Sequence, residues 1–378
     1  MNVLITGSKG FLGSNLCLRL SEDHNIQIHE FHRGTPLSEL EILVPTADFI
    51  IHLAGENRPK NINDFHSTNV NLTKRLCEII NNHNKEIPIL FSSTTQATLD
   101  NPYGKSKKEA EDILSTFAKD TGNPVAIYRL PGVFGKWCRP NYNSVVATFC
   151  FNIANNIDIE IHNPDAKLTL VYIDDVINLF LQDIKKTITN LTYPEIIHSY
   201  DTSVLDLANK IKAFKESRKN LISENVGTGF TRALYATYLS YLNISQISYP
   251  LISHQDDRGM FVEMLKTKNS GQFSFFTINS GVTRGQHYHH SKTEKFIVVK
   301  GMAKFRFKNL LTKEFSEFTV NSEDLTVVES IPGWAHDISN PSNEETLVML
   351  WANENFNPAN PDTIGYSLDE DEDEDEDE

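Results

Sequence analysis

The fold of the first half of the chain follows from the stretch Asn2-Val3-Leu4-Ile5-Thr6-Gly7-Ser8-Lys9-Gly10-Phe11-Leu12-Gly13. Its apolar run predicts a strand over Asn2–Thr6, and the periodicity of Leu12–Leu20 predicts a helix directly after it. Between them, Gly7 permits a tight turn, Gly10 lets a pyrophosphate approach the backbone, and Gly13 allows close packing of helix on strand. A phosphate would lie at the helix N-terminus, where unpaired N–H groups favour anions. The stretch therefore predicts a dinucleotide-binding turn.

Strand-like and helical segments alternate as far as Lys185. The further strand-like runs are Ile26–His32, Phe49–Leu53, Ile89–Ser93, Val125–Arg129 and Leu168–Ile173, and the further helical patterns are Val70–Ile80, Pro102–Phe117 and Asp174–Lys185. Strands separated by helices of this length predict an α/β fold, a doubly wound parallel sheet with helices on both faces.

The pattern changes after about residue 245, where only short strands punctuated by Gly, Asn and Ser follow. They are expected at Phe261–Leu265, Phe273–Ile278, Lys295–Val299, Ala303–Phe307, Glu317–Val320, Thr326–Val328 and Thr346–Trp351. Many short strands at regular spacing predict an all-β sandwich or barrel. With the boundary placed in Asn243–Tyr249, we expect one domain over residues 1–243, a second over 244–366, and an acidic tail over 367–378.

Charge is concentrated at one end of the chain. The net charge of the 378 residues is −15, and Asp369–Glu378 contributes ten of the fifty acidic residues. Ten adjacent like charges repel one another, so we expect a disordered tail that is solubilising, natural or appended, rather than partner-binding. The preceding residues are mildly acidic and carry no basic stripe, which argues against nucleic-acid binding.

Other features of the sequence indicate a cytoplasmic protein. No run of about 18 apolar residues is present, so we expect no membrane span. The first residues lack the basic and long apolar regions of a signal peptide. Cys17, Cys77, Cys138 and Cys150 show no CxxC spacing, and we expect them to be reduced.

The end of the second predicted strand bears on the choice of cofactor. An acidic residue there would bind the ribose 2′-hydroxyl of NAD, whereas an arginine can hold the 2′-phosphate of NADP. The strand ends Glu30-Phe31-His32-Arg33-Gly34, and Glu30 lies too early to reach the ribose. Arg33 therefore predicts NADPH as cofactor, and the alternative is an exposed surface arginine.

A tyrosine and a lysine stand four residues apart on a predicted helix. Tyr103 and Lys107 share one face, where a nearby ammonium favours tyrosinate and so eases proton transfer by the phenol. Upstream, the strand end Phe91-Ser92-Ser93-Thr94-Thr95 carries hydroxyl groups that can hold a carbonyl oxygen. In this order, the glycine turn, the hydroxyl groups and the Tyr–Lys pair predict an oxidoreductase site.

These motifs resemble those of the extended short-chain dehydrogenase/reductases that act on nucleotide-sugars. The similar segments are Gly7–Gly13, His52–Gly55, Asn69, Ser92–Thr94, Tyr103 with Lys107, Arg129–Gly135 and Val171–Asp175. The resemblance implies that Thr94, Tyr103 and Lys107 are catalytic. It also implies cofactor contacts from Gly7, Lys9, Gly10, Phe11, Gly13, Arg33, Leu53, Ala54, Gly55, Tyr103 and Lys107.

Two features of this resemblance concern the substrate. Asn141, Tyr142 and Asn143 lie where the family binds substrate, although an ordinary surface loop is the alternative. Thr94 and Tyr103 are only nine residues apart, where relatives carry a longer insertion. We therefore expect a more open or differently shaped substrate cleft.

A second concentration of chemistry lies in Gly285-Gln286-His287-Tyr288-His289-His290-Ser291-Lys292-Thr293-Glu294. Because side chains alternate along a strand, His287 and His289 share a face, and Glu294 can return to it after a turn. His336 completes a four-ligand set from a neighbouring strand. Three imidazoles and a carboxylate suit zinc, iron, manganese or nickel, and zinc is favoured because nothing demands redox chemistry. The alternative is a patch of hydrogen-bonded histidines, and His290 is expected on the opposite face.

The spacing from Gly281 to Gly301 resembles the first motif of the cupin family of jelly-roll barrels, although Ile331 replaces the usual proline of the second motif. Asp256–Glu263, Gly281–His287 and Ile331–His336 are also similar to the 4-keto-6-deoxyhexose 3,5-epimerases. In those enzymes, the histidine matching His287 is a base and no metal is used. Their acidic tyrosine would fall near Phe356, so this mismatch favours a metal role for His287.

The combination of both domains resembles a family of bifunctional capsular polysaccharide enzymes of the UDP-N-acetyl-L-fucosamine pathway. The resemblance implies that the cupin domain epimerises a UDP-linked 4-keto-6-deoxy-N-acetylhexosamine next to its ketone, and that the N-terminal domain reduces the ketone with NADPH. One alternative is a dehydratase or epimerase with tightly held NAD, but Thr95-Gln96 stand where dehydratases carry Asp-Glu. Another is a reductase whose cupin domain only binds sugar or mediates dimerisation. Because cupins commonly pair edge strands, we expect a homodimer.

Overall fold

The computed structural model describes the chain except residues 60, 62, 187, 257–258, 263–264, 268–270, 355–358 and 370–378. The chain divides into two compact units. The first comprises residues 1–134, 138–144 and 167–202, and the second comprises residues 135–137, 145–166 and 203–378. Each unit is described separately below.

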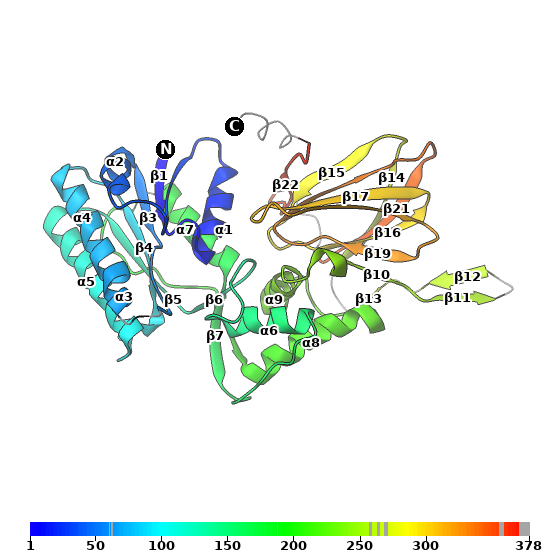
Figure 1. Cartoon of the computed structure of the whole chain (residues 1–378), viewed down its shortest axis with the longest axis horizontal. Helices are drawn as coiled ribbons and strands as arrows, with labels where there is room; N and C mark the ends of the chain where they lie inside the picture. The colour runs from blue at the N-terminus through cyan, green and yellow to red at the C-terminus, as the bar shows by residue number, and fades with distance from the viewer. Residues whose placement is uncertain are drawn as a thin grey trace. The chain divides into compact units, whose positions relative to one another are not determined.

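A five-stranded parallel sheet forms the centre of the first unit (Figure 1). Its strands lie in the order β2-β1-β3-β4-β5, with bounds Gln27–Phe31, Asn2–Thr6, Phe49–His52, Ile89–Thr94 and Val125–Leu130. These apolar strands are buried on both faces by helices, as the near-continuous apolar runs predict. The predicted doubly wound parallel sheet is confirmed.

Two layers of helices cover this sheet. One face carries α2 (Glu39–Thr46), α4 (Leu72–Asn82) and α5 (Pro102–Thr121), whose apolar residues form one core with the sheet. The other face carries α1 (Phe11–Ser21) and α7 (Ile173–Lys186), which pack on each other (Figure 1). A short helix α3 (Asn63–Phe65) and a π-helical segment η1 (His66–Asn71) precede α4, and a 3-10 turn η2 (Thr95–Thr98) follows β4. A small sheet of β6 (Gly132–Phe134), β7 (Lys167–Tyr172) and β8 (Tyr200–Ser203) completes the unit.

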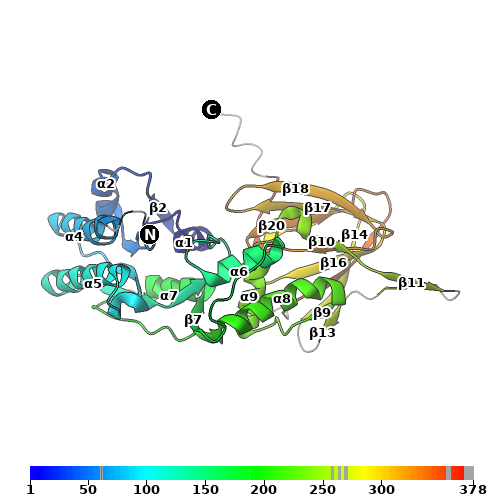
Figure 2. The ribbon, with the colours of Figure 1, turned by 60° about the horizontal axis from the view of Figure 1, so that its bottom comes forward.

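Two antiparallel five-stranded sheets dominate the second unit (Figure 2). One has the order β10-β19-β16-β21-β14, with bounds Ser248–Pro250, Thr326–Glu329, Glu294–Lys300, Thr346–Ala352 and Gln272–Ile278. The other has the order β18-β17-β20-β15-β22, with bounds Phe315–Asn321, Met302–Asn309, Trp334–Ser339, Thr283–Tyr288 and Ile364–Gly365. Phe296, Phe305, Phe307 and Val348 lie in the apolar core between them. The predicted all-β, cupin-like domain is confirmed.

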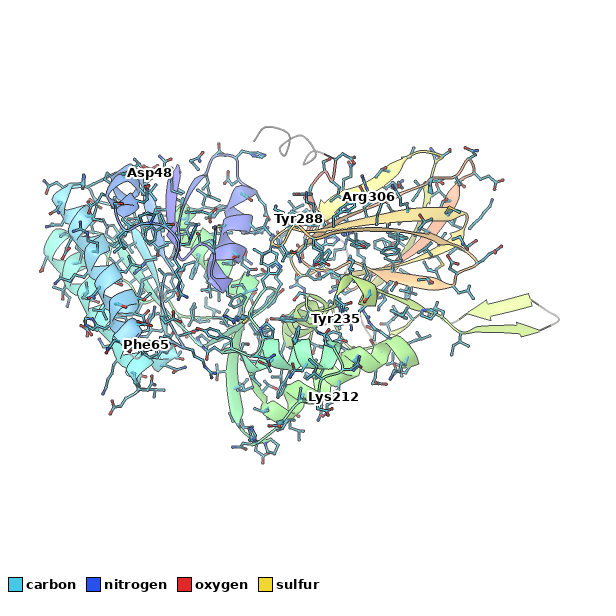
Figure 3. All side chains as sticks on the ribbon, viewed as in Figure 1. Asp48, Phe65, Lys212, Tyr235, Tyr288 and Arg306 are labelled. Carbon is cyan, nitrogen blue, oxygen red and sulfur yellow. The ribbon has the colours of Figure 1, made fainter. Side chains whose placement is uncertain are left out.

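The second unit also contains three helices next to the β16 sheet, namely α6 (Val145–Ala154), α8 (Val204–Asn220) and α9 (Gly229–Leu239) (Figure 2). Figure 3 labels Lys212 on α8, Tyr235 on α9, and Tyr288 and Arg306 on the barrel strands. The smaller elements are η3 (Ile244–Gln246), a parallel pair of β9 (Ile222–Ser223) with β13 (Lys266–Thr267), and a hairpin of β11 (Ser253–Asp256) with β12 (Gly259–Val262).

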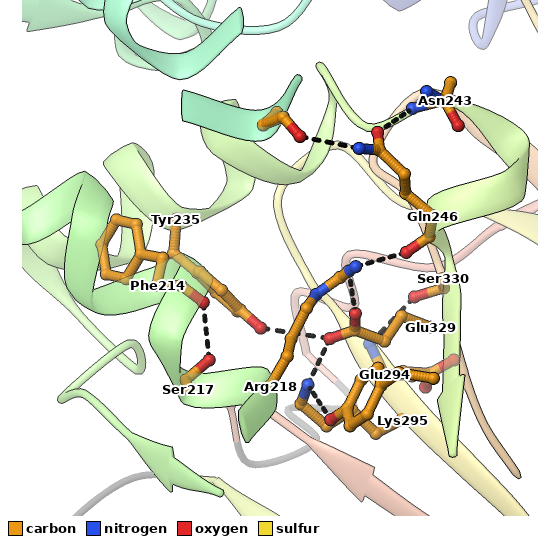
Figure 4. A network of polar contacts seen from close by, with 12 residues as sticks. Phe214, Ser217, Arg218, Tyr235, Asn243, Gln246, Glu294, Lys295, Glu329 and Ser330 are labelled. Carbon is orange, nitrogen blue, oxygen red and sulfur yellow. Dashed lines mark hydrogen bonds and ion pairs between the residues drawn. The ribbon is translucent and has the colours of Figure 1, made fainter. Parts of the chain in front are cut away.

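A buried polar network joins the helices to the barrel (Figure 4). The carboxylate of Glu329, in β19, forms ion pairs with Arg218 of α8 and Lys295 of β16. Tyr235 of α9 donates to Glu329 at 3.3 Å, and Lys295 donates to the Tyr249 hydroxyl at 3.0 Å. Buried charges require such pairing. The helices within residues 203–239 therefore pack on the barrel and belong to the same compact unit. The domain boundary between residues 243 and 244, expected from the sequence, stays a prediction.

Some elements were not predicted from the sequence, namely α2, α6, α8 and α9. Within the described part of the chain, no helix is both long enough and apolar enough to span a membrane. Cys17, Cys77, Cys138 and Cys150, all of them in described positions, form no disulfide bond.

Candidate functional site

The glycine-rich turn of the first unit has no room for a side chain at Gly7 or at Gly13. Gly7 adopts φ +75°, and a Cβ there would lie 2.7 Å from the backbone nitrogen of Ala54. A Cβ on Gly13 would lie 2.2 Å from the Gly7 carbonyl oxygen. The turn thus packs directly on the loop that contains Leu53 and Ala54, and α1 begins at Phe11.

The same turn has the features of an anion site. Lys9 and Gly10 are exposed at the start of α1, and the first N–H groups of a helix have no partner within the helix. The Ser8 hydroxyl is buried and has no hydrogen-bond partner among the described residues. This combination of exposed backbone and an orphaned buried hydroxyl fits a bound dinucleotide.

A buried histidine fixes the neighbouring loop. The His52 ring lies between Thr6 Oγ1 at 2.7 Å and Thr73 Oγ1 at 2.9 Å, and Thr6 Oγ1 also accepts from Ala54 N at 3.2 Å. Burial lowers the pKa of His52 to about 3, so the ring is neutral. These contacts hold Leu53, Ala54 and Gly55 against the glycine-rich turn.

Arg33 lies just beyond β2, as expected, and its side chain is 87% exposed. Its guanidinium forms an ion pair with Glu56, which was not predicted as part of the site. Glu56 follows Gly55 directly, and its backbone N–H donates to Asn69 Oδ1 at 2.7 Å. The Arg33 side chain is therefore exposed, and its ion pair with Glu56 places it next to the loop Leu53–Gly55.

Thr94, Tyr103 and Lys107 come together at the carboxyl end of β4. Thr94 ends that strand, and Tyr103 and Lys107 lie in the first turns of α5, which begins where Asn101 Oδ1 accepts from Gly104 N at 2.8 Å. A Cβ on Gly104 would lie 2.2 Å from the Gln96 carbonyl oxygen, so only glycine lets α5 pack on η2. This close approach brings Tyr103 into a side-chain hydrogen bond with Thr94 although only nine residues separate them.

Lys107 occupies a desolvated position. It is 4% exposed, its Nζ donates to the Ser92 carbonyl at 2.6 Å, and it lies 4.2 Å from the Phe91 ring centroid. Burial lowers the pKa of Lys107 to about 7, against the opposing influence of Glu111. Burial also raises the pKa of Tyr103, and the hydrogen bond with Thr94 opposes this shift. Lys107 can therefore take up and release a proton near neutral pH, whereas Tyr103 stays protonated in this state.

One buried side chain that was not predicted supports this group. Glu111 is fully buried, accepts from Ser93 Oγ at 2.5 Å and pairs with Arg129 at 2.6 Å. It stands four residues after Lys107 on the same helix face, a spacing that could have indicated it. A Cβ on Gly55 would lie 3.6 Å from Lys107 Nζ, so the loop Leu53–Gly55 and Lys107 are neighbours.

The three predicted substrate residues differ in their surroundings. Asn141 and Asn143 are exposed, whereas Tyr142 is half-buried and its hydroxyl donates to Glu56 Oε1 at 3.0 Å. Burial and Glu56 raise the pKa of Tyr142. Tyr142 thus lies beside the carboxylate that also pairs with Arg33, and the substrate role of all three residues stays a prediction.

The second unit brings His287, His289, Glu294 and His336 together, with one ligand atom of each within 4.8 Å of the others. His289 Nε2 lies 3.2 Å and His336 Nε2 lies 3.5 Å from Glu294 Oε2. Glycine and glutamine form a bulge at Gly285–Gln286, with φ values of +97° and +53°, that places His287 opposite His336. The predicted convergence of these four side chains is therefore present.

Protonation states in this cluster suit a metal ion. Burial lowers the pKa of His287 to about 3, with His336 and His289 acting in the same direction, and burial lowers the pKa of His336. Burial opposes ionisation of Glu294, but hydrogen bonding to His289 holds the Glu294 pKa well below its usual value. Neutral imidazoles and an ionised carboxylate are the forms that bind divalent metals. His287 Nε2 and both ring nitrogens of His336 are buried without a hydrogen-bond partner among the described residues, which fits ligation.

His290 lies outside the cluster and packs edge-on against Tyr288 at 5.5 Å between ring centroids. Lys292, which was not predicted, pairs with Glu294 Oε1 at 2.7 Å. The predicted mismatch at Phe356 lies outside the described residues.

Two family models match the sequence of this chain. The model of the NAD dependent epimerase/dehydratase family matches residues 3–192, about half of the chain. The chain belongs to this epimerase/dehydratase family. Membership implies a nicotinamide cofactor, in agreement with the glycine-rich turn. The model of the polysaccharide biosynthesis C-terminal domain matches residues 254–364 of the barrel.

Relatives of this epimerase/dehydratase chain extend over its whole length. UDP-2-acetamido-2,6-beta-L-arabino-hexul-4-ose reductase of Pseudomonas aeruginosa is 50% identical over 370 residues, which cover 98% of this chain and 100% of the relative. The crystal structure of the capsular polysaccharide assembling protein CapF from Staphylococcus aureus is similar with a TM-score of 0.67 and 40% identity, covering 97% of this chain and 100% of CapF. The resemblance to the capsular polysaccharide enzymes, which spans both domains of the chain, is thereby confirmed.

A more distant structure supports the fold alone. UDP-glucuronic acid 4-epimerase from Bacillus cereus, in complex with NAD, has a TM-score of 0.51 and 19% identity, and the match covers 57% of this chain and 84% of the epimerase. This likeness confirms the doubly wound α/β fold of the matched part of the chain.

Proposed function

We propose that this protein reduces the 4-keto group of a UDP-linked 6-deoxy-N-acetylhexosamine with NADPH. The observation that carries the proposal is the meeting of Thr94, Tyr103 and Lys107 beside the glycine-rich turn. The name of the Pseudomonas aeruginosa relative, a UDP-linked hexulose reductase, supports this choice of substrate. Arg33, exposed beyond β2, would hold the 2′-phosphate and so favour NADPH over NADH.

The chemistry of the reduction follows from the positions of three side chains. NADPH, when bound, supplies a hydride to the carbonyl carbon. Thr94 would hold the carbonyl oxygen, and Tyr103 would donate the proton that converts it into a hydroxyl group. Lys107, whose pKa burial lowers to about 7, can return a proton to Tyr103 near neutral pH. The ketone gains a hydride and a proton, and the cofactor is oxidised to NADP⁺.

We also propose that the barrel epimerises the same sugar at the carbon next to the ketone. His287, His289, Glu294 and His336 would hold a divalent metal, with zinc favoured because three imidazoles and a carboxylate suit it. Such a metal supplies Lewis acidity that polarises a ketone. The adjacent C–H bond is acidic because of the ketone, so inversion requires only removal and return of a proton. The two reactions would serve capsular polysaccharide precursor synthesis, since the similar CapF is named as a capsular polysaccharide assembling protein.

Deuterium exchange separates the two activities. We would incubate the protein with the UDP-linked 4-keto sugar in deuterated water, with and without NADPH. Without NADPH, we expect deuterium to appear at the carbon next to the ketone. When NADPH is added, we expect it to be oxidised. Loss of exchange in a folded His336→Ala variant would tie it to the cluster. Retained exchange in that variant would contradict a catalytic metal, and NADPH oxidation without any exchange would favour a cupin domain that only binds sugar or dimerises.

We further propose a cytoplasmic homodimer. Phe275 is 72% exposed on edge strand β14, beside Phe273 and opposite Met349 of β21. Exposed apolar side chains on an unpaired edge favour burial against a second copy. Light scattering should give twice the mass of one chain, and Phe275→Glu should lower it to one. A single-chain mass for the unchanged protein would overturn this part.

A further inference from the structure

The carboxylate of Asp362 contacts the loop His290–Lys292 of the barrel, although about 70 residues separate them in the sequence. Asp362 Oδ1 accepts from the backbone N–H of His290 at 2.8 Å. Asp362 Oδ2 accepts from the backbone N–H groups of Ser291 at 2.7 Å and Lys292 at 2.8 Å, and from Ser291 Oγ at 3.0 Å. One side chain therefore satisfies three consecutive backbone donors between His289 and Glu294.

The backbone of Asp362 contacts a member of the four-residue cluster directly. Its carbonyl oxygen lies 2.5 Å from His289 Nδ1. A carbonyl can only accept a hydrogen bond, so Nδ1 donates to it, and in a neutral His289 ring, the form that binds a metal, Nε2 then keeps its lone pair. That Nε2 is the atom 3.2 Å from Glu294 Oε2, in the centre of the cluster.

The segment around Asp362 also holds the strand that carries His287. In β22, Gly365 pairs with His287 and Ile364 pairs with Tyr288, and Tyr366 N donates to the Gln286 carbonyl at 2.8 Å. Residues 362–366 thus contact both histidine-bearing positions, His287 and His289, from one side. Neither the spacing nor the order of residues along the chain indicates this arrangement.

We propose that Asp362 is the positioning residue of the four-residue cluster, which it presets for a divalent metal by fixing His289 and the loop His290–Lys292. This inference rests on the metal site proposed above. Hydrogen bonds to the outer nitrogen of a ligating histidine orient its ring, and losing such a partner lowers metal affinity by about 10- to 100-fold. An asparagine would keep one acceptor oxygen but turn an NH₂ group toward backbone N–H donors.

The test is metal binding by the full chain and its variants. Zinc affinity would be measured by competition with a chromophoric chelator, and the absorption spectrum would be recorded with saturating cobalt(II). Asp362→Asn and Asp362→Ala should weaken zinc binding by about 10- to 100-fold. They should also change the cobalt spectrum, because without the carboxylate contacts to His290–Lys292 the Asp362 carbonyl is no longer held in place against His289 Nδ1. Asp369→Asn is the matched control, since Asp369 is 60% exposed on the same segment and pairs with Arg306 instead.

Metal-free unfolding, followed in chelator, distinguishes positioning from general support of the fold. A purely structural role would lower metal-free stability but leave affinity and the cobalt spectrum as in the unchanged protein, and this result would overturn the inference. Should Asp362→Ala fail to fold, Asp362→Asn carries the comparison. Absence of metal binding by the unchanged protein would overturn the metal site itself, and with it this role of Asp362.

Discussion

Removing the carboxylate of Glu329 should destabilise the second unit strongly. Glu329 is 1% exposed and is the shared partner of Arg218 and Lys295, the latter 3% exposed. Burial alone would lower the pKa of Lys295, but Glu329 raises it above its usual value. Burial likewise opposes ionisation of Glu329, and Arg218 and Lys295 hold its pKa below the usual range. The three groups are therefore charged together in the folded state.

Glu329→Gln leaves two buried cations facing a neutral amide. Breaking a buried ion pair in this way costs about 3–5 kcal/mol. The matched control is Glu317→Gln, because Glu317 is 50% exposed and pairs with Lys304 at 3.3 Å. An exposed pair of this kind contributes about 0–1 kcal/mol. Replacing all three members, as in Glu329→Leu with Lys295→Met and Arg218→Met, should restore much of the loss, since no buried charge remains.

Urea unfolding followed by tryptophan fluorescence measures this effect in the relevant unit. The chain contains three tryptophans, Trp137, Trp334 and Trp351, and all lie in the second unit. We expect the midpoint to fall sharply for Glu329→Gln and little for Glu317→Gln. A free energy of unfolding for Glu329→Gln within about 1 kcal/mol of the unchanged protein would refute the reasoning, because that is the cost of an exposed pair.

Three further predictions concern catalysis, pH and metal removal. Gly104→Leu should lower kcat for ketone reduction by about 100-fold, because the leucine side chain forces α5 away from η2 and separates Tyr103 from Thr94. Steady-state kinetics measures this effect, with Gly365→Ala as the control because a Cβ at Gly365 meets nothing within 4 Å. An unchanged kcat for Gly104→Leu would contradict the prediction. The pKa of Lys107 lies near 7 when folded and near 10.5 when unfolded, so the unfolded state binds more protons between these values and the free energy of unfolding should rise with pH across that window. Lys107→Met should remove this rise, of at most roughly 1.4 kcal/mol per pH unit, in denaturant titrations from pH 7 to 10, and identical slopes for both proteins would count against it. A strong chelator should lower the Tm of the zinc-loaded protein by several degrees but leave that of His336→Ala unchanged, and equal shifts in the two proteins would argue against metal binding at the cluster.

Much of the fold was predictable because its signals are local. Alternating apolar runs located β1, β4 and β16 to within a residue or two, and the glycine spacing identified the dinucleotide turn. Helix α6 gave no such signal. Its residues Val146, Ala147, Phe149, Cys150, Ile153 and Ala154 are all buried, and its polar face consists only of Thr148 and Asn152, which is too narrow to mark a helical period.

The residues of the candidate sites also differ in whether a local sequence pattern identifies them. Tyr103 with Lys107, and His287 with His289, are recognisable because regular spacing places them on one face of a helix or strand. Glu329 and Asp362 act through partners brought close only by folding, as with Asp362 and His289, 73 residues apart. Burial then changes what these groups do, since it lowers the pKa of Lys107 to about 7 in a way that no spacing reveals.

Transfer of deuterium from the cofactor tests the proposed ketone reduction most directly. The UDP-linked 4-keto sugar would be incubated with NADPH deuterated at the transferable position of its nicotinamide ring, and the product examined by NMR and mass spectrometry. We predict one deuterium bound at the former carbonyl carbon for each NADPH oxidised, and no transfer by Tyr103→Phe. NADPH left unoxidised, or a sugar product without deuterium at that carbon, would contradict the assignment of this protein as a nucleotide-sugar ketoreductase.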